Sequence, residues 1–551
     1  MNSSINILTR RDFLSRSTRL ASLAALSSLT DVPMVMQRAL AEGSIGVPGP
    51  NGRIKKVLFL FLRGANDGLN SVIPLSDPAY VTSRETIAIA PSPDPTWNYS
   101  SSGKALWTPS GSADPVYGNY ALPLGNDFAG LHPSLKFLVP SYNAGQMAML
   151  HRVGYPKQSR SHFDSQVYWE NGLPSNDAKK EGIFYRAMVE SGLANTAPLT
   201  GVSFQSSLPL LLRGSAAAMT NVERPERFGL LGVPASASAE KKSKTMLSLA
   251  NSSEFADKRS RELLRLQYEN FNRTLGIFDQ IDFSENGNTF RDNEVTDGDQ
   301  NWANENAGGG YYLFPTSNNK NGGYRRTAGN QVNKYVVPTS SYDFFGNLKA
   351  AALVLNKTDA IVAGCQLDGF DTHSNQGGAT GSHANLLRRI GWAIYGLQKY
   401  FANYGDKCKW EDVVVVTLSE FGRTTKENDD NGTDHAEASV MWVAGGAVKG
   451  FQPNGLGGVT RSGIHQCSGA DSVPWITGPT GTMFKAEDRY LQRSLDYRQV
   501  LGKIIRDHLG ATQDQLSRII PGYANETAER LKSGGTQTKD GVKIAPEPDI
   551  V

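Results

Sequence analysis

The fold is constrained most by a set of short, almost purely apolar runs that recur along the chain. Unbroken runs of this length are typical of strands buried on both faces, as in a parallel sheet. Stretches with apolar residues at helical spacing lie between the later runs, for example in residues 386–401. This alternation predicts an α/β fold with a mostly parallel central sheet, helices on both faces and loop insertions. The runs occupy residues 57–62, 147–153, 360–367, 412–418 and 440–444.

Polar residues gather where these strands or the neighbouring turns end. Asp67 follows the first run through a glycine-containing turn, and Ser159 and Ser161 follow the second. Open α/β sheets bind ligands at the carboxyl ends of their strands, so we expect these side chains to share one site. The remaining groups are Asp371 with His373, Glu420 with Arg423, and Asp434 with His435.

Carboxylates and imidazoles without cysteine are ligands for a divalent metal such as zinc, manganese or magnesium. Metal pairs of this kind clamp the attacking and leaving oxygens of a phosphoryl or related transfer. We therefore expect one or two ions, with ligands from Asp67, Asp371, His373, Glu420, Asp434 and His435.

The candidate catalytic residues are Ser161, Arg160 and Arg423. Ser161 starts a predicted helix, where a nearby cation and the helix amides favour a nucleophile, and Ser159 is the second choice. Each arginine can bind a phosphate or sulfate through two parallel hydrogen bonds. Structural alternatives stay open: Ser161 as a helix cap, Asp67 as a turn cap, Arg423 as an ion-pair partner. His162 suits a metal ligand and a packed neighbour equally well.

The N-terminus has the features of an export signal. The sequence TRRDFL at residues 9–14 resembles a twin-arginine motif, an apolar stretch follows, and Ala39-Leu40-Ala41 fits a cleavage site. We predict a signal peptide at 1–41, a partnership with the twin-arginine translocase during export, and a periplasmic or secreted protein. No later stretch approaches the ~18 apolar residues of a membrane span.

The remaining chain is long enough for one large α/β domain with insertions. We place a linker at 42–56, the domain at 57–523, an Asn/Gly-rich surface insertion at 282–326 and a polar, frayed tail at 524–551. Without the leader's five Arg and two Asp, 51 basic and 51 acidic residues remain. This balance argues against nucleic acid as a partner. Three scattered cysteines are too few for a disulfide framework.

Five sequence blocks stand out along the chain: RGANDGLN at 63–70, SRSHFD at 159–164, GFDTH at 369–373, SEFGRT at 419–424 and GTDH at 432–435. Together they resemble domain-of-unknown-function family 1501. That family consists of exported, often twin-arginine proteins and is placed in the alkaline phosphatase and sulfatase superfamily, so the resemblance implies an alkaline-phosphatase-like fold.

The superfamily pattern implies roles for individual residues. Asp67 matches its first metal-binding Asp and Ser161 its nucleophile, while Asp371 and His373 match an Asp–His pair at shorter spacing. A further Asp–His pair has two possible registers. By strand order, which we prefer, Glu420 replaces the Asp and Asp434-His435 supplies the final His. By local sequence similarity, Asp434-His435-Ala436-Glu437 resembles an Asp-His-Ala-His run in which Glu437 replaces the second His. Either register lacks one nitrogen ligand, which implies a weakly held or absent second metal.

These observations lead to two main hypotheses of function. The first is a metal-dependent hydrolase of phosphate or sulfate esters, acting on a small-molecule or glycan-linked anionic ester. The second is a catalytically degenerate member of the fold that acts as a secreted binding or cell-surface protein. A redox enzyme with an organic cofactor is a third idea, which no G-x-G-x-x-G or haem motif supports.

Overall fold

Strand β1 (Lys56–Leu62) lies in the middle of the molecule, and all of its residues are buried. Its side chains point alternately to two hydrophobic clusters, one on each face of the sheet. Leu58, Leu60 and Leu62 belong to one cluster, and Val57, Phe59 and Phe61 belong to the other. Burial on both faces explains why the sequence of this strand is an unbroken apolar run.

The structure is a computed structural model. It describes residues 45–91, 120–193, 199–217, 219–224, 271–284, 339–454, 458–473 and 489–551, with short pieces within 238–246 and 287–316. The predicted signal peptide lies outside the described residues, as does most of the predicted insertion. Of that insertion, β8 (Arg291–Asp292) and β9 (Tyr311–Tyr312) form a short antiparallel pair.

The central sheet has nine strands in the described part of the chain, and most of its pairings are parallel. Strand β12 runs antiparallel to both of its neighbours, β11 and β5, so the sheet is mixed. The order is β15 (Ile464–His465), β5 (Met147–Gly154), β12 (Ser439–Ala444), β11 (Val413–Leu418), β1, β10 (Val362–Leu367), β6 (Gly201–Phe204) and β7 (Thr220–Asn221), with β16 (Leu495–Asp496) also on β5. All five apolar runs are strands, which confirms the prediction of a mostly parallel α/β sheet.

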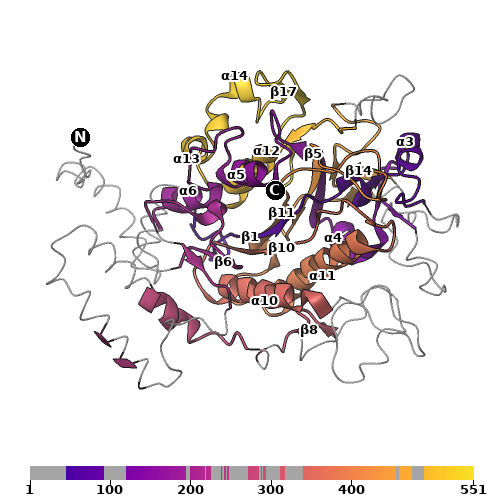
Figure 1. The fold of residues 1–551 in the computed structure, drawn as a ribbon. Coiled ribbons are helices and arrows are strands. Elements are labelled where there is room, and N and C mark those ends of the chain that lie inside the picture. Colours follow the sequence, from indigo (N-terminus) through magenta and orange to yellow (C-terminus); the bar gives the residue numbers. More distant parts are fainter. Residues whose placement is uncertain are drawn as a thin grey trace, which may run out of the picture.

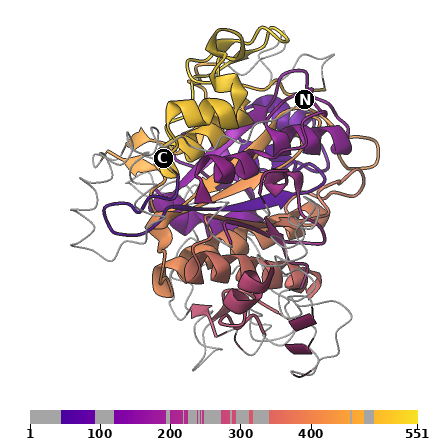
Figure 2. The same cartoon turned by 90° about the vertical axis from the view of Figure 1, so that its left-hand side faces the viewer.

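Helices cover both faces of the sheet, as predicted (Figures 1 and 2). On one face lie α10 (Tyr342–Lys357) and α11 (Ser382–Asn403), whose buried residues join the cluster of Leu58. On the other face lie α5 (His162–Asn171), α6 (Ile183–Glu190), α12 (Tyr497–Lys503) and α13 (Gln513–Ile519). In the described part of the chain, no helix is both long and apolar enough to cross a membrane.

The C-terminal segment differs from the frayed tail that we expected. It forms α14 (Glu526–Glu529) and a hairpin of β17 (Gly535–Thr536) and β18 (Lys543–Ile544). Leu531, Ala545 and Ile550 are buried in the same cluster as α12 and α13. Four buried apolar residues hold this segment on the core: Leu531, Ile544, Ala545 and Ile550. At the other end of the domain, Ile45 of the expected linker is buried in this cluster too.

Five of the eight histidines lie outside the cluster discussed below. Four of them are buried and His465 is partly buried, and desolvation lowers the pKa of each. The pKa is about 3 for His132 and His151 and about 4 for His383, His465 and His508. These imidazoles are therefore neutral in the folded protein at neutral pH, whereas in the unfolded chain they gain a proton below about pH 6.5.

We expect the free energy of unfolding to fall as the pH drops from about 6.5 to about 4. In that window the unfolded chain binds more protons than the folded protein, so acid favours unfolding, by up to ~1.4 kcal/mol per pH unit for each histidine. Urea unfolding at pH 7.5 and pH 5 measures the effect, and His508→Gln should reduce it. Equal midpoints at the two pH values would contradict this prediction.

Candidate metal centre

The strand directions bring the predicted site residues to one edge of the sheet. Strands β1, β10 and β11 are parallel neighbours, and β5 runs the same way because it is antiparallel to β12. Their carboxyl ends therefore share one edge. Because β12 is reversed, the residues that precede it arrive at that edge as well. This topology places Asp434 and His435 opposite the segments that leave the other strands.

Three side chains at this edge form a cluster that suits a metal ion. His162, Asp371 and His435 each direct a ligand atom to within 4.8 Å of the other two. The two imidazole Nε2 atoms lie 3.1 Å apart. Asp371 Oδ1 is 3.1 Å from His435 Nε2, and Asp371 Oδ2 is 3.5 Å from His162 Nε2. Ligand atoms about 2.05 Å from a tetrahedral zinc ion are separated by about 3.3 Å, so these distances fit one ion.

Hydrogen bonds on the far side of each ring turn the Nε2 lone pairs toward the cluster. His435 Nδ1 donates to the carbonyl oxygen of Arg160 at 2.8 Å, and a carbonyl can only accept. His162 Nδ1 lies 3.4 Å from the Glu420 carboxylate. With both rings neutral and protonated at Nδ1, the two Nε2 lone pairs would repel at 3.1 Å unless a proton or a metal ion lies between them. Oriented imidazoles of this kind are the usual setting of metal ligands.

His373 lies beside this group of three. Its Nε2 is 2.9 Å from His435 Nε2 and 3.1 Å from Asp371 Oδ1, and its Nδ1 faces Asp434 Oδ1 at 3.2 Å. The side chains of Asp371 and His373 are each 44% exposed, whereas those of His162 and His435 are 25% exposed. The centre is therefore open to solvent on the side of Asp371 and His373. Asp434 supports His373 from behind and does not belong to the group of three.

Glu420 was predicted as a ligand, but its carboxylate lies behind His162. It is completely buried and accepts hydrogen bonds from the backbone of Gly64 at 2.8 Å and Ala65 at 3.1 Å, and from Gln166 at 3.0 Å. Burial alone would raise the pKa of Glu420, but the hydrogen bonds from His162 and the Gly64 amide outweigh it and lower the pKa. The ionised carboxylate in turn raises the pKa of His162, mainly through their hydrogen bond.

The guanidinium of Arg423 is buried and hydrogen-bonded within the protein. It donates to the carbonyl oxygens of Ala65 and Thr433 at 2.9 Å and of Phe370 at 3.1 Å, and it also bonds to the Gly64 carbonyl and to Asp371 Oδ1. Partial burial alone would raise the pKa of Asp371, but the bond and charge of Arg423 bring it to about 2. Arg423 therefore holds Asp371 ionised and in place, and its side chain is 0% exposed, so a substrate anion does not reach it.

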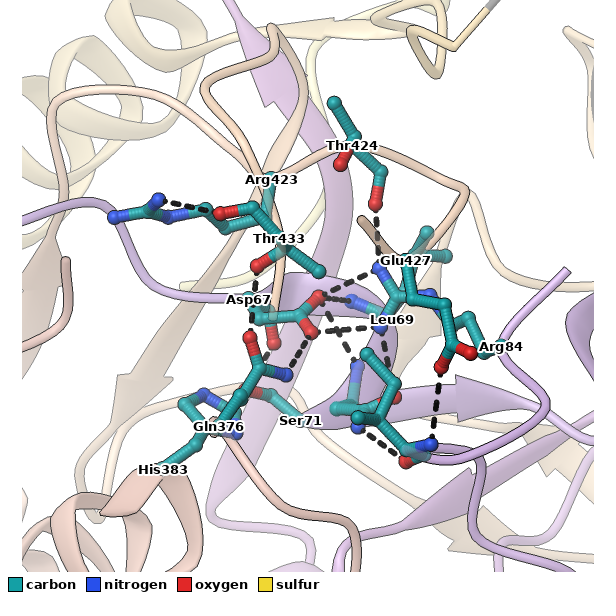
Figure 3. A network of polar contacts seen from close by, with 12 residues as sticks. Asp67, Leu69, Ser71, Arg84, Gln376, His383, Arg423, Thr424, Glu427 and Thr433 are labelled. Carbon is teal, nitrogen blue, oxygen red and sulfur yellow. Dashed lines mark hydrogen bonds and ion pairs between the residues drawn. The ribbon is translucent and has the colours of Figure 1, made fainter. Parts of the chain in front are cut away.

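Asp67, another predicted ligand, does not belong to the cluster, and its carboxylate faces Arg84 and Gln376 instead (Figure 3). It is fully buried and forms an ion pair with Arg84, whose Nη1 and Nη2 lie 2.6 and 3.1 Å from its two oxygens. Gln376 and the amides of Leu69 and Asn70 donate to it as well. Burial raises the pKa of Asp67, but Arg84 outweighs this effect and the pKa is about 2. Arg84 therefore neutralises the charge that a second metal would need.

Ser161 and Arg160 lie directly before His162. Ser161 is the N-cap of α5, and its Oγ accepts from the Asp164 amide at 3.4 Å, so the capping role is confirmed. The guanidinium of Arg160 stacks on the ring of Tyr490, 4.3 Å from the ring centre. Ser159 Oγ, the second choice for the nucleophile, donates to Asp164 at 3.2 Å. Arg160 thus keeps its hydrogen-bond donors exposed at the rim of the cluster.

Close backbone packing fixes the segments that carry these side chains. Gly64 has a φ of +106°, and a Cβ atom there would lie 2.4 Å from the amide nitrogen of Asp371. Gly422 meets the carbonyl of Ala438 so closely that a Cβ atom would lie 1.7 Å from its oxygen. These two glycines let the ends of β1 and β11 approach the ligand segments, which explains the glycines in the RGANDGLN and SEFGRT blocks.

Sequence reasoning left His162 undecided and did not single out Arg84 or Gln376. The position of His162 directly after a helix cap, among acidic residues at other strand ends, was the available signal. Arg84 and Gln376 lie in irregular segments without a motif, so no spacing pointed to them.

The model of a family described as Protein of unknown function (DUF1501) matches residues 54–455, well over half of the chain. The chain belongs to this family. The match includes every residue of the metal cluster and every predicted site residue. No curated protein and no solved structure is significantly similar to this DUF1501 protein.

Two substitutions separate a metal ligand from a structural carboxylate. Asp371→Asn should weaken zinc binding by about 100-fold, because it removes a ligand at an open site. It should destabilise the protein less than Asp67→Asn, because Asp371 is 44% exposed and Arg423 keeps its carbonyl acceptors. Asp67→Asn should leave one zinc ion bound but lower the free energy of unfolding by about 3–5 kcal/mol, because Arg84 loses its buried partner. Zinc titration against a competing chelator and urea unfolding measure the two quantities. Loss of the ion in Asp67→Asn at unchanged stability would contradict this assignment.

Proposed function

We propose that this DUF1501 protein is an exported metal-dependent hydrolase of phosphate or sulfate esters. The observation that carries the proposal is the convergence of two imidazole nitrogens and a carboxylate within coordination distance at a solvent-open sheet edge. Two histidines and one carboxylate are a set found in catalytic zinc sites, which leave a position for water or substrate. A closed structural site would instead surround the ion with four protein ligands.

His162, Asp371 and His435 would hold the ion, with His373 beside them at the open position. When bound, the metal would supply a Lewis acid that polarises the ester and stabilises negative charge on oxygen. The donor set suits zinc or manganese better than magnesium, because magnesium prefers oxygen ligands. A single ion is the expected stoichiometry, since Arg84 already compensates the charge of Asp67.

Ser161 is the proposed nucleophile, because it directly precedes the ligand His162 and its hydroxyl has one long hydrogen bond. Its oxygen would attack phosphorus or sulfur and displace the alcohol, which takes up a proton from water while the serine proton passes to solvent. Water would then cleave the serine ester and release phosphate or sulfate. Arg160, with its guanidinium exposed at the rim, is the group suited to hold the anion. Arg423 is not, because its donors are bound to backbone carbonyls and Asp371.

Membership of the alkaline phosphatase and sulfatase superfamily is part of this proposal. In its support, polar groups meet at the carboxyl edge of an α/β sheet, and Ser161 opens a helix after the strand next to β12. Export by the twin-arginine route, and hence a periplasmic or secreted location, is proposed from the arginine pair and cleavage motif of residues 1–41.

The buried Asp67–Arg84 pair favours a second candidate function. It removes the charge that a second metal would need, as expected for a catalytically degenerate, secreted binding or cell-surface protein. In that case the single ion would contribute to ligand binding or stability without turnover.

The test is turnover of aryl phosphate and aryl sulfate by the zinc- and manganese-loaded protein. We expect Ser161→Ala to lower kcat by about 100-fold or more while the ion stays bound, because it removes the attacking oxygen. Ser159→Ala is the matched control and should change kcat little. Chelation of the metal should abolish turnover, and adding the metal back should restore it.

The remaining outcomes decide between the alternatives. Metal-dependent turnover that survives in Ser161→Ala would transfer the attack to water and refute the serine nucleophile. Bound metal without any turnover of either ester would refute the hydrolase and support the binding protein.

A further inference from the structure

We propose that Gln376 is a positioning residue of the metal centre, where one buried side-chain amide sets the relative position of the two segments that carry its ligands. The inference rests on the proposed metal function and assigns a role to a residue that does not touch the ion. It also gives the buried Asp67–Arg84 pair a purpose in the site.

The carbonyl oxygen of the Gln376 side chain accepts two hydroxyl hydrogen bonds. Thr372 Oγ1 donates to it at 2.9 Å and Thr433 Oγ1 at 2.7 Å. Thr372 lies between Asp371 and His373, and Thr433 directly precedes Asp434 and His435. A single acceptor therefore joins the segment after β10 to the segment before β12, 61 residues apart in the chain. A backbone hydrogen bond from Thr433 to Thr372 at 3.1 Å runs beside it.

Asp67 determines which way the amide points. The amide nitrogen of Gln376 donates to Asp67 Oδ2 at 2.6 Å, and an ionised carboxylate can only accept (Figure 3). The amide therefore cannot flip, and its oxygen must face the two threonines. Arg84 keeps the carboxylate ionised through its ion pair. Arg84 and Asp67 thus fix which end of the Gln376 amide donates and which accepts, and this in turn makes both threonine hydroxyls donors.

The amide is also held still by its surroundings. Gln376 is fully buried, its backbone amide donates to Asn431 at 3.0 Å, and its carbonyl accepts from His383 at 3.2 Å. Thr433 is fully buried and Thr372 nearly so. Because the side chains of the ligand Asp371 and its neighbour His373 are each 44% exposed, the rigidity of this region must come from the residues packed beneath them. Gln376 and Arg423 supply it with different contacts: Gln376 binds the threonine side chains, whereas Arg423 binds the carbonyls of Phe370 and Thr433.

The experiment removes one hydroxyl at a time without changing side-chain shape. We expect Thr372→Val and Thr433→Val each to weaken zinc binding by about 10-fold, since partners behind the ligands typically change metal affinity by about 10–100-fold. Thr433→Ser keeps the hydroxyl and should restore wild-type affinity. Zinc affinity is measured by chelator competition, and the visible spectrum of the cobalt-loaded protein reports the ligand geometry directly.

Thr358→Val is the matched control. Thr358 is a buried threonine whose hydroxyl donates to Val354 at 2.7 Å, and it lies before the amino end of β10, at the opposite edge of the sheet. It should lose stability as the site variants do, yet keep the affinity and cobalt spectrum of the wild type.

The outcomes separate this inference from the proposed function. Unchanged zinc affinity and cobalt spectrum in both site variants would reduce Gln376 to a purely structural residue and overturn the inference, while the metal centre would stand. A wild-type protein that binds neither zinc nor cobalt would overturn both. Should a valine variant fail to fold, Gln376→Glu provides the second measurement, because a second carboxylate against Asp67 should weaken zinc binding as well.

Discussion

The site depends above all on the buried guanidinium of Arg423. Four carbonyl oxygens and the carboxylate of Asp371 surround this one side chain, so the ends of β1 and β10 and the loop before β12 meet at it. Arginine suits this position because it offers five donors in a rigid plane and stays charged when buried. Charge and geometry are set together: the cation that fixes the backbone also keeps Asp371 ionised for its role at the cluster.

The sheet edge carries several carboxylates close together, and their mutual repulsion is offset by partners bound to each one. Asp67, Asp371, Glu420 and Asp434 all lie near this edge, and each is compensated in a different way. Arg84 neutralises Asp67, Arg423 neutralises Asp371, backbone amides and Gln166 satisfy Glu420, and Arg489 with Asn428 binds Asp434. Between these compensated groups, the Nε2 atoms of His162 and His373 lie 3.1 and 2.9 Å from that of His435, and the proposed cation would lie beside them.

The sheet could be predicted from the sequence because burial on both faces leaves an unbroken apolar run, as in β1 and β11. The meeting of Asp371, His373, Asp434 and His435 also followed from strand ends. The roles of Glu420, Arg423 and Asp67 could not be predicted in this way, because sequence spacing does not reveal whether a polar side chain faces a ligand or the protein backbone. Glu420 and Arg423 turn toward amides and carbonyls of the turn after β1, and Asp67 turns toward Arg84.

His162 was left undecided since its partner Glu420 is more than 250 residues away. The packed C-terminal hairpin was missed because only a few apolar residues anchor it.

That hairpin has a consequence for how the chain is made. Ile550 is fully buried beside α12 and α13, and the Lys449 amide donates to its carbonyl. This face of the sheet therefore stays incomplete until residue 550 has left the ribosome, although strand β1 is synthesised almost 500 residues earlier. Until then the apolar residues that this segment covers stay exposed to solvent or to a chaperone. The last part of this face is therefore closed only when Leu531, Ala545 and Ile550 dock on it.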